Sequence, residues 1–273
     1  MLVGMPRLPS PAQLRPRALR RRSARAQAKD AVAIIDAPEV DGLDDDQLAA
    51  DVVAQLDLIG AVLVRQFALS GDHRRLEALG RRLGTPSTND VPNPQSPVVH
   101  RVEPMQVPER DRRGNPVLST TTHTFPCHSD EFFSVTPADV IFLQCVRPAS
   151  CGGGRTLIAP AREVTRRLSA RTLEQLRAQV WPSEAGPSAL LAGDAGDPRL
   201  RYNAGVLSRV KLSPELRATR DELHRAVERA TAEIALGAGD LLIVDNTRVL
   251  HGRTSMKPGS RRLFLRMRAY RAG

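Results

Sequence analysis

His128-Ser129-Asp130 is the stretch around which the rest of the chain can be arranged, and His251-Gly252-Arg253 is the distant stretch expected to meet it. When a His-x-Asp triplet lies on an extended strand end, its first and third side chains share one side of the backbone. Two imidazoles and one carboxylate can occupy one face of a metal octahedron and leave the opposite face open, as Fe(II) requires when it activates O₂. The pattern therefore predicts a metal site formed by His128, Asp130 and His251.

The apolar stretches around these motifs are short and mostly typical of strands. Residues 138–146, 241–244 and 262–270 are strand-like, and the last of these alternates apolar and polar side chains. One helix is well supported: it begins at Ser213-Pro214-Glu215 and its apolar side chains recur at helical spacing as far as Gly237. Strands that flank a helical insertion, with few βαβ repeats, predict a mainly β fold, a sandwich or jelly roll with added helices, and argue against a doubly wound sheet.

Composition argues against a nucleic-acid-binding or membrane protein. The 273 residues carry a net charge of +10, but residues 1–29 hold eight basic and no acidic side chains, so the rest of the chain is only weakly basic. We expect residues 1–29 to be a disordered basic arm and residues 30–273 to form a single domain. No apolar run is long enough to span a membrane, and three cysteines without a CxxC pair favour a cytoplasmic location.

A second group of residues suits a dicarboxylate co-substrate. 2-Oxoglutarate chelates a metal through its keto acid end and needs a cation for its far carboxylate, for which arginine is best because its guanidinium is forked. Arg262 follows His251 by eleven residues across one turn, so a hairpin would return it to the metal. The hydroxyl of Thr156, on the strand after the Gly152-Gly153-Gly154 turn, is the natural second partner of that carboxylate.

Four sequence elements together resemble the taurine/2-oxoglutarate dioxygenase (TauD/TfdA-like) superfamily. They are His128-Ser-Asp130, Gly153-Gly154-Arg155-Thr156, Asp245-Asn-Thr-Arg-Val-Leu-His-Gly-Arg253 and Arg262. The resemblance implies a double-stranded β-helix (jelly roll) core with a helical insertion. It also implies Fe(II) held by His128, Asp130 and His251, and 2-oxoglutarate held by Thr156 and Arg262. O₂ would then be used to hydroxylate an unactivated C–H bond, with release of succinate and CO₂.

The resemblance also narrows the reaction and the substrate. Related halogenases have a small residue in place of the carboxylate ligand, so Asp130 favours hydroxylation or desaturation. Residues 246–253 are closest in style to amino-acid hydroxylases and γ-butyrobetaine-type hydroxylases. Only two tyrosines and one tryptophan are present, which leaves little material for an aromatic cage and disfavours trimethylammonium substrates.

Several side chains are candidates for binding the substrate. Arg266 lies four residues after Arg262 on the same strand face, where taurine-type relatives place an arginine for the substrate's acid group. Four further polar candidates are Arg248, Arg253, Arg201 and Asn203. These arginines favour a small anionic or zwitterionic substrate, such as a free amino acid or amino-acid-like acid of specialised metabolism. His100, alone in the strand-like stretch 98–102, is interpreted as an ordinary surface or core imidazole.

Three alternatives stay open at this point. A dioxygenase of the same family could act on a sulfonate or another small carboxylate. A zinc hydrolase could use the same His/Asp/His set, but it would have no use for Thr156 and Arg262. A non-catalytic β-sandwich could use residues 1–29 as an RNA- or membrane-binding arm. The sequence gives no indication of the oligomeric state.

Overall fold

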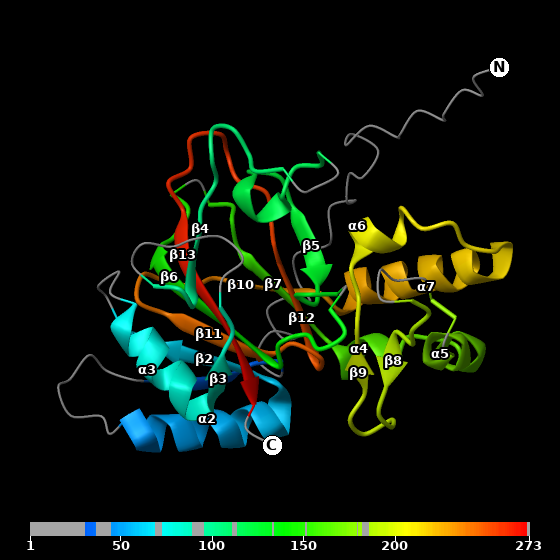
Figure 1. The fold of residues 1–273 in the computed structure, drawn as a ribbon, viewed down its shortest axis with the longest axis horizontal. Helices are drawn as coiled ribbons and strands as arrows, with labels where there is room; N and C mark the ends of the chain where they lie inside the picture. Colours follow the sequence, from blue (N-terminus) through cyan, green and yellow to red (C-terminus); the bar gives the residue numbers. More distant parts are fainter. Residues whose placement is uncertain are drawn as a thin grey trace.

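Two β-sheets of unequal size form the centre of the protein (Figure 1). The computed structural model describes residues 31–36, 45–68, 73–88, 96–110, 114–132, 134–150, 152–178, 180–181 and 186–271. The predicted basic arm, residues 1–29, lies outside these ranges. Within the described ranges, no helix has both the length and the apolar character needed to cross a membrane.

The larger sheet has seven strands in the order β1-β2-β11-β6-β13-β3, with β4 also paired to β13. The strands are β1 (Ala33–Asp36), β2 (Ala61–Arg65), β3 (Gly84–Pro86), β4 (Val99–Val102), β6 (Val140–Arg147), β11 (Leu241–Asp245) and β13 (Leu263–Arg271). The predicted strands at 138–146, 241–244 and 262–270 are all present, with ends that differ by one or two residues.

The smaller sheet carries the two histidine motifs. Its order is β10-β7-β12-β5, and all of its neighbours are antiparallel. The strands are β5 (Phe125–His128), β7 (Thr156–Pro160), β10 (Ala232–Ile234) and β12 (Val249–Arg253). His251 of β12 is the direct partner of His128 of β5, so strand pairing alone brings the two imidazoles together.

An apolar layer fills the space between the two sheets. It joins Ile141, Leu242 and Phe264 of the larger sheet to Ile158 and Ala232 of the smaller one. On the other face of the larger sheet, α2 (Asp45–Ile59) and α3 (Arg74–Leu83) pack through a second apolar cluster (Figure 1). The architecture is therefore mainly β with helices, as the sequence predicted.

The chain between β7 and β10 forms the expected helical insertion, beside the smaller sheet in Figure 1. It contains α4 (Ala161–Thr165), α5 (Ala170–Arg177), α6 (Ala204–Leu207) and α7 (Pro214–Ala230). It also contains a short hairpin, β8 (Leu191–Ala192) and β9 (Arg199–Leu200). A single-turn 3₁₀ helix, Leu118–Thr120, precedes β5.

The longest helix ends earlier than its apolar spacing indicated. Ser213 caps α7 by accepting a hydrogen bond from the Leu216 amide, as predicted, but the helix stops at Ala230 and does not reach Gly237. Residues Ala232–Ile234 instead pair with β7 as strand β10 and bury alternate side chains. Ala230 and Ile234 satisfy both a helical and a strand pattern, and pairing with β7 decides between them.

Candidate metal centre

The three predicted ligands lie together in the structure. His128 ends β5, His251 lies opposite it on β12, and Asp130 follows two residues after His128. The Nε2 atoms of His128 and His251 are 3.2 and 3.5 Å from Asp130 Oδ1. All three residues are buried, and each offers a ligand atom within 4.8 Å of the others.

The protonation states of these side chains suit a metal. His128 Nδ1 lies 2.9 Å from the carbonyl oxygen of Pro126, so we assign the proton to Nδ1, which leaves the Nε2 lone pair facing Asp130 and His251. Burial lowers the pKa of His251, and the neighbouring Asp130 offsets this only in part. Metal binding needs neutral imidazoles and ionised carboxylates, so the site is prepared for a divalent cation.

The charge of Asp130 is set by its neighbours. Burial alone would raise its pKa, but the Arg266 cation beside it holds that pKa well below the usual value. Arg266 Nη1 is 3.3 Å from Asp130 Oδ2, while Oδ1 faces the two imidazoles. Asp130 is thus ionised and presents one oxygen to the candidate metal position.

Arg262 and Thr156 both lie near Arg253, which follows the candidate ligand His251 by two residues, and Arg262 has features of an anion site. Thr156 begins β7 and pairs with Arg253, two residues beyond His251 on β12. Arg262 is 5% exposed, its guanidinium carbon lies 3.6 Å from the ring centroid of Phe264, and its Nε is buried with no hydrogen-bond partner among the described residues. Burial, and then the nearby Arg253, lower the pKa of Arg262 to about 9. A bound carboxylate would balance this buried charge.

Two of the arginines proposed as substrate contacts are engaged elsewhere. Arg253 Nη2 donates to the carbonyl oxygens of Thr121 and His123 at 2.8 and 2.7 Å, so it braces the segment before β5. Arg248 Nη1 donates to the carbonyl oxygens of Leu56 and Asp57, both at 2.8 Å. These bonds to main-chain carbonyl groups give both side chains structural roles in the fold.

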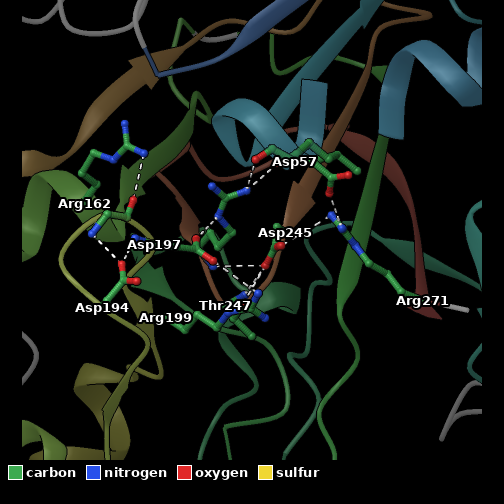
Figure 2. A network of polar contacts seen from close by, with 11 residues as sticks. Asp57, Arg162, Asp194, Asp197, Arg199, Asp245, Thr247 and Arg271 are labelled. Carbon is green, nitrogen blue, oxygen red and sulfur yellow. Dashed lines mark hydrogen bonds and ion pairs between the residues drawn. The ribbon is translucent and has the colours of Figure 1, made fainter. Parts of the chain in front are cut away.

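Arg248 belongs to a network that we call the turn network: Arg248, Arg271, Asp57, Asp197 and Asp245. Its Nε is 2.7 Å from Asp197 Oδ1, and Figure 2 shows Asp197, Asp245, Asp57 and Arg271 close together around the turn between β11 and β12. A cavity of about 400 Å³ borders Arg248 and Asp197 but is lined by none of the three candidate ligands. This cavity is therefore separate from the candidate metal centre.

Arg201 and Asn203 lie on the insertion where it meets the His-x-Asp stretch. The backbones of Asn203 and His128 form an isolated bridge, and the Ser129 amide donates to the Tyr202 carbonyl at 2.8 Å. Asn203 Oδ1 caps α6 by accepting from the Val206 amide, and Arg201 Nη2 donates to the Ser134 carbonyl at 3.0 Å. Both residues lie near the candidate metal centre, and each side chain already makes one hydrogen bond within the fold.

The structure gives His100 a place that the sequence did not indicate. His100 of β4 lies directly opposite Arg266 of β13. Phe264 and Val102, which pair two positions away, belong to the layer between the sheets. Because side chains alternate along a strand, His100 and Arg266 lie on that same face. Their Cβ atoms are thus roughly 4.5–5.5 Å apart. The sequence indicated which neighbours share a strand face with His100, but not which strand pairs with it.

Comparison with known proteins agrees with this arrangement. The family described as "Taurine catabolism dioxygenase TauD, TfdA family" matches residues 20–187 and 184–268. The chain belongs to this TauD/TfdA family. Its relatives include the enduracididine beta-hydroxylase of Streptomyces hygroscopicus, 33% identical over 95 residues, which are 35% of this chain and 28% of the relative.

Two further proteins extend the comparison. The L-asparagine oxygenase of Streptomyces coelicolor is 29% identical over 181 residues, which are 62% of this chain and 52% of the relative. The matches thus span about half or less of these relatives' lengths. The crystal structure of an asparagine oxygenase shares the fold with a TM-score of 0.69 at 22% identity, over 83% of this chain and 78% of that one.

Proposed function

We propose that this TauD/TfdA-family protein is an Fe(II)- and 2-oxoglutarate-dependent oxygenase that hydroxylates an unactivated C–H bond of a free amino acid or amino-acid-like acid. The observation that carries the proposal is the buried cluster of His128, Asp130 and His251 beside Arg262, whose buried Nε has no partner among the described residues. A metal with three protein ligands and a co-substrate with a distant carboxylate would use both features.

The roles of the chain's own residues follow from their chemistry. His128, Asp130 and His251 would hold Fe(II), and Thr156 and Arg262 would hold the far carboxylate of 2-oxoglutarate. When bound, these groups supply O₂-dependent oxidation of a C–H bond with release of succinate and CO₂. The two facing sheets would form a double-stranded β-helix within a single cytoplasmic domain, residues 30–273.

Substrate recognition would involve Arg266 and His100. Arg266 is the arginine on the face of β13 nearest Asp130, and its guanidinium can pair with a substrate acid group by a charge-assisted hydrogen bond. His100, opposite Arg266, would add a hydrogen-bonding group to the same side of the site. The names of the relatives, an asparagine oxygenase and an enduracididine hydroxylase, support an amino-acid-like substrate.

Substrate-dependent formation of succinate tests this proposal. The Fe(II)-loaded protein would be supplied with 2-oxoglutarate, O₂ and, one at a time, the proteinogenic amino acids and taurine. We expect at least one amino acid to stimulate succinate formation and to gain one oxygen in mass, and His251→Ala to abolish both signals. Stimulation by taurine alone would favour a sulfonate dioxygenase, and loss of two hydrogens would indicate desaturation. Absence of 2-oxoglutarate turnover with iron bound would contradict the proposal.

A further inference from the structure

Asn246, at the start of the turn between β11 and β12, contacts the main chain of the candidate ligand Asp130 on both sides. Its Oδ1 accepts a hydrogen bond from the Asp130 amide at 2.8 Å, and its Nδ2 donates to the Asp130 carbonyl oxygen at 3.1 Å. Nδ2 also donates to the carbonyl oxygen of Ala138 at 2.9 Å. The side chain is 1% exposed, so water does not compete for these bonds.

These bonds replace a strand partner that Asp130 lacks. Pairing of β5 with β12 reaches His128 and His251, and β5 ends there. Two residues further on, Asp130 is in a turn, where Glu131 has a φ of 54°. The Asn246 amide exchanges two hydrogen bonds with Asp130, as a residue of a neighbouring antiparallel strand would. It thereby fixes the main chain of the carboxylate ligand, Asp130, relative to the sheet.

The other end of Asn246 is equally well fixed. Its main-chain amide donates to the Asp139 carbonyl oxygen at 2.8 Å. The preceding Asp245 shapes the turn, because its Oδ1 accepts from the amide and hydroxyl of Thr247 at 3.0 and 2.8 Å. Asn246 also precedes His251 by five residues on the same short segment. Asn246 therefore fixes the position of Asp130 relative to the segment that carries the second histidine, His251.

We propose that Asn246 is a positioning residue for the metal centre: it holds the Asp130 carboxylate in register with His128 and His251 and does not itself touch the metal. The proposal rests on the metal site of the proposed function. Asparagine suits this role because it offers a donor and an acceptor on one planar group, whereas aspartate has no donor. Groups that orient metal ligands typically contribute about 10–100-fold to metal affinity.

The test measures binding of Co(II) to the metal-free protein by its visible d–d absorption, without any turnover. We expect Asn246→Ala to weaken Co(II) binding by about 10–100-fold. Thr247→Val is the matched control: it removes a side-chain hydrogen bond from the same turn without contacting Asp130, and Co(II) affinity should stay within about twofold of the wild type. Thermal melting of each metal-free protein reports the accompanying loss of stability.

The outcomes separate a positioning role from a structural one. If Asn246→Ala melts at a lower temperature but binds Co(II) as the wild type does, Asn246 only stabilises the fold and the proposal is overturned. If the wild type binds no Co(II), both the proposed function and this inference fail. If wild type and Thr247→Val bind but Asn246→Ala does not, the inference is supported provided that the variant is folded by circular dichroism.

A measurement on the unmutated protein covers the case in which Asn246→Ala does not fold. Hydrogen exchange in the metal-free wild type, followed by NMR, should show the Asp130 amide protected to a degree comparable with the β12 amides. Exchange of that amide at the rate of an exposed turn would show that the contact does not persist in solution, which would overturn the inference.

Discussion

Arginines in the turn before β12 and in the segment after it are used in opposite ways. At its start, in the turn network, Arg248 binds two carbonyl oxygens and Asp197, and Arg271 pairs with Asp57 and Asp245. In the segment between β12 and β13, Arg262 is buried over an aromatic ring, and its Nε has no partner among the described residues. Arginines whose charge is already balanced stabilise the fold, whereas a buried arginine without such balance favours an anionic ligand.

The largest effect should come from the residues that define the metal centre. His251→Ala and Asp130→Ala each remove one of three ligands, so we expect 2-oxoglutarate turnover to fall by on the order of 10³-fold or more. Succinate formation at saturating Fe(II) checks this. Turnover within tenfold of the wild type in either variant would show that the cluster is not the catalytic metal site.

Replacing Arg248 or Arg262 by glutamine tests the comparison itself. Arg262→Gln should raise the KM for 2-oxoglutarate by about 100-fold or more, because a charge-assisted contact in a buried site is lost. Arg248→Gln should leave that KM within about twofold. It should lower the free energy of unfolding by about 1–3 kcal/mol, because three contacts between Arg248 and the rest of the fold are lost. Steady-state kinetics and urea unfolding of both variants supply the four values.

The reverse pattern would break the comparison. One such result is a raised KM for 2-oxoglutarate in Arg248→Gln, and another is a loss of stability in Arg262→Gln without a change of that KM. Either would mean that a buried arginine without a charge partner does not identify the co-substrate site.

A smaller effect is expected at His100. His100→Ala should raise the KM for the amino-acid substrate by about 5–15-fold, the value of one hydrogen bond, and leave the KM for 2-oxoglutarate unchanged. Arg101→Gln is the matched control, since Arg101 is the next residue of β4 and is exposed, with Glu103 as its ion-pair partner. Equal changes in both variants would show that His100 contributes only to the strand.

The smallest effect concerns pH. Only the charged form of Arg262 binds a carboxylate, so affinity for 2-oxoglutarate is complete below the pKa of Arg262, about 9, and falls as the pH rises above it. At pH 9.5 the dissociation constant should be about fourfold higher than at pH 7.5. Anaerobic calorimetry with the Mn(II)-loaded protein measures it, and a constant that does not change up to pH 9.5 would contradict this role of Arg262.

Local patterns in the sequence predicted the parts of the site that depend on neighbouring residues. The sequence predicted that His128 and Asp130 lie close together, and they do, although Asp130 lies in a turn just beyond β5. The start of α7 follows from Ser213 and Pro214. Partners that depend on distant pairing were not predictable. Ala232–Ile234 became a strand only because β7 pairs with it, and His100 lies opposite Arg266 only because β4 pairs with β13.

The arginines illustrate the same limit. Arg248 and Arg253 were equivalent candidates in the sequence, and only the fold shows which carbonyl groups each one binds. Asn246 was part of the motif that indicated the family, but its contacts with Asp130 depend on two segments more than a hundred residues apart.

The central claim is that one buried centre binds both Fe(II) and 2-oxoglutarate, and visible absorption under anaerobic conditions tests it most directly. Adding Fe(II) and 2-oxoglutarate to the wild type should produce the weak metal-to-ligand charge-transfer band of a chelated keto acid. The band should be absent in His251→Ala, and in Arg262→Gln it should require far more 2-oxoglutarate. A wild-type protein that binds iron but shows no band at saturating 2-oxoglutarate would contradict the account.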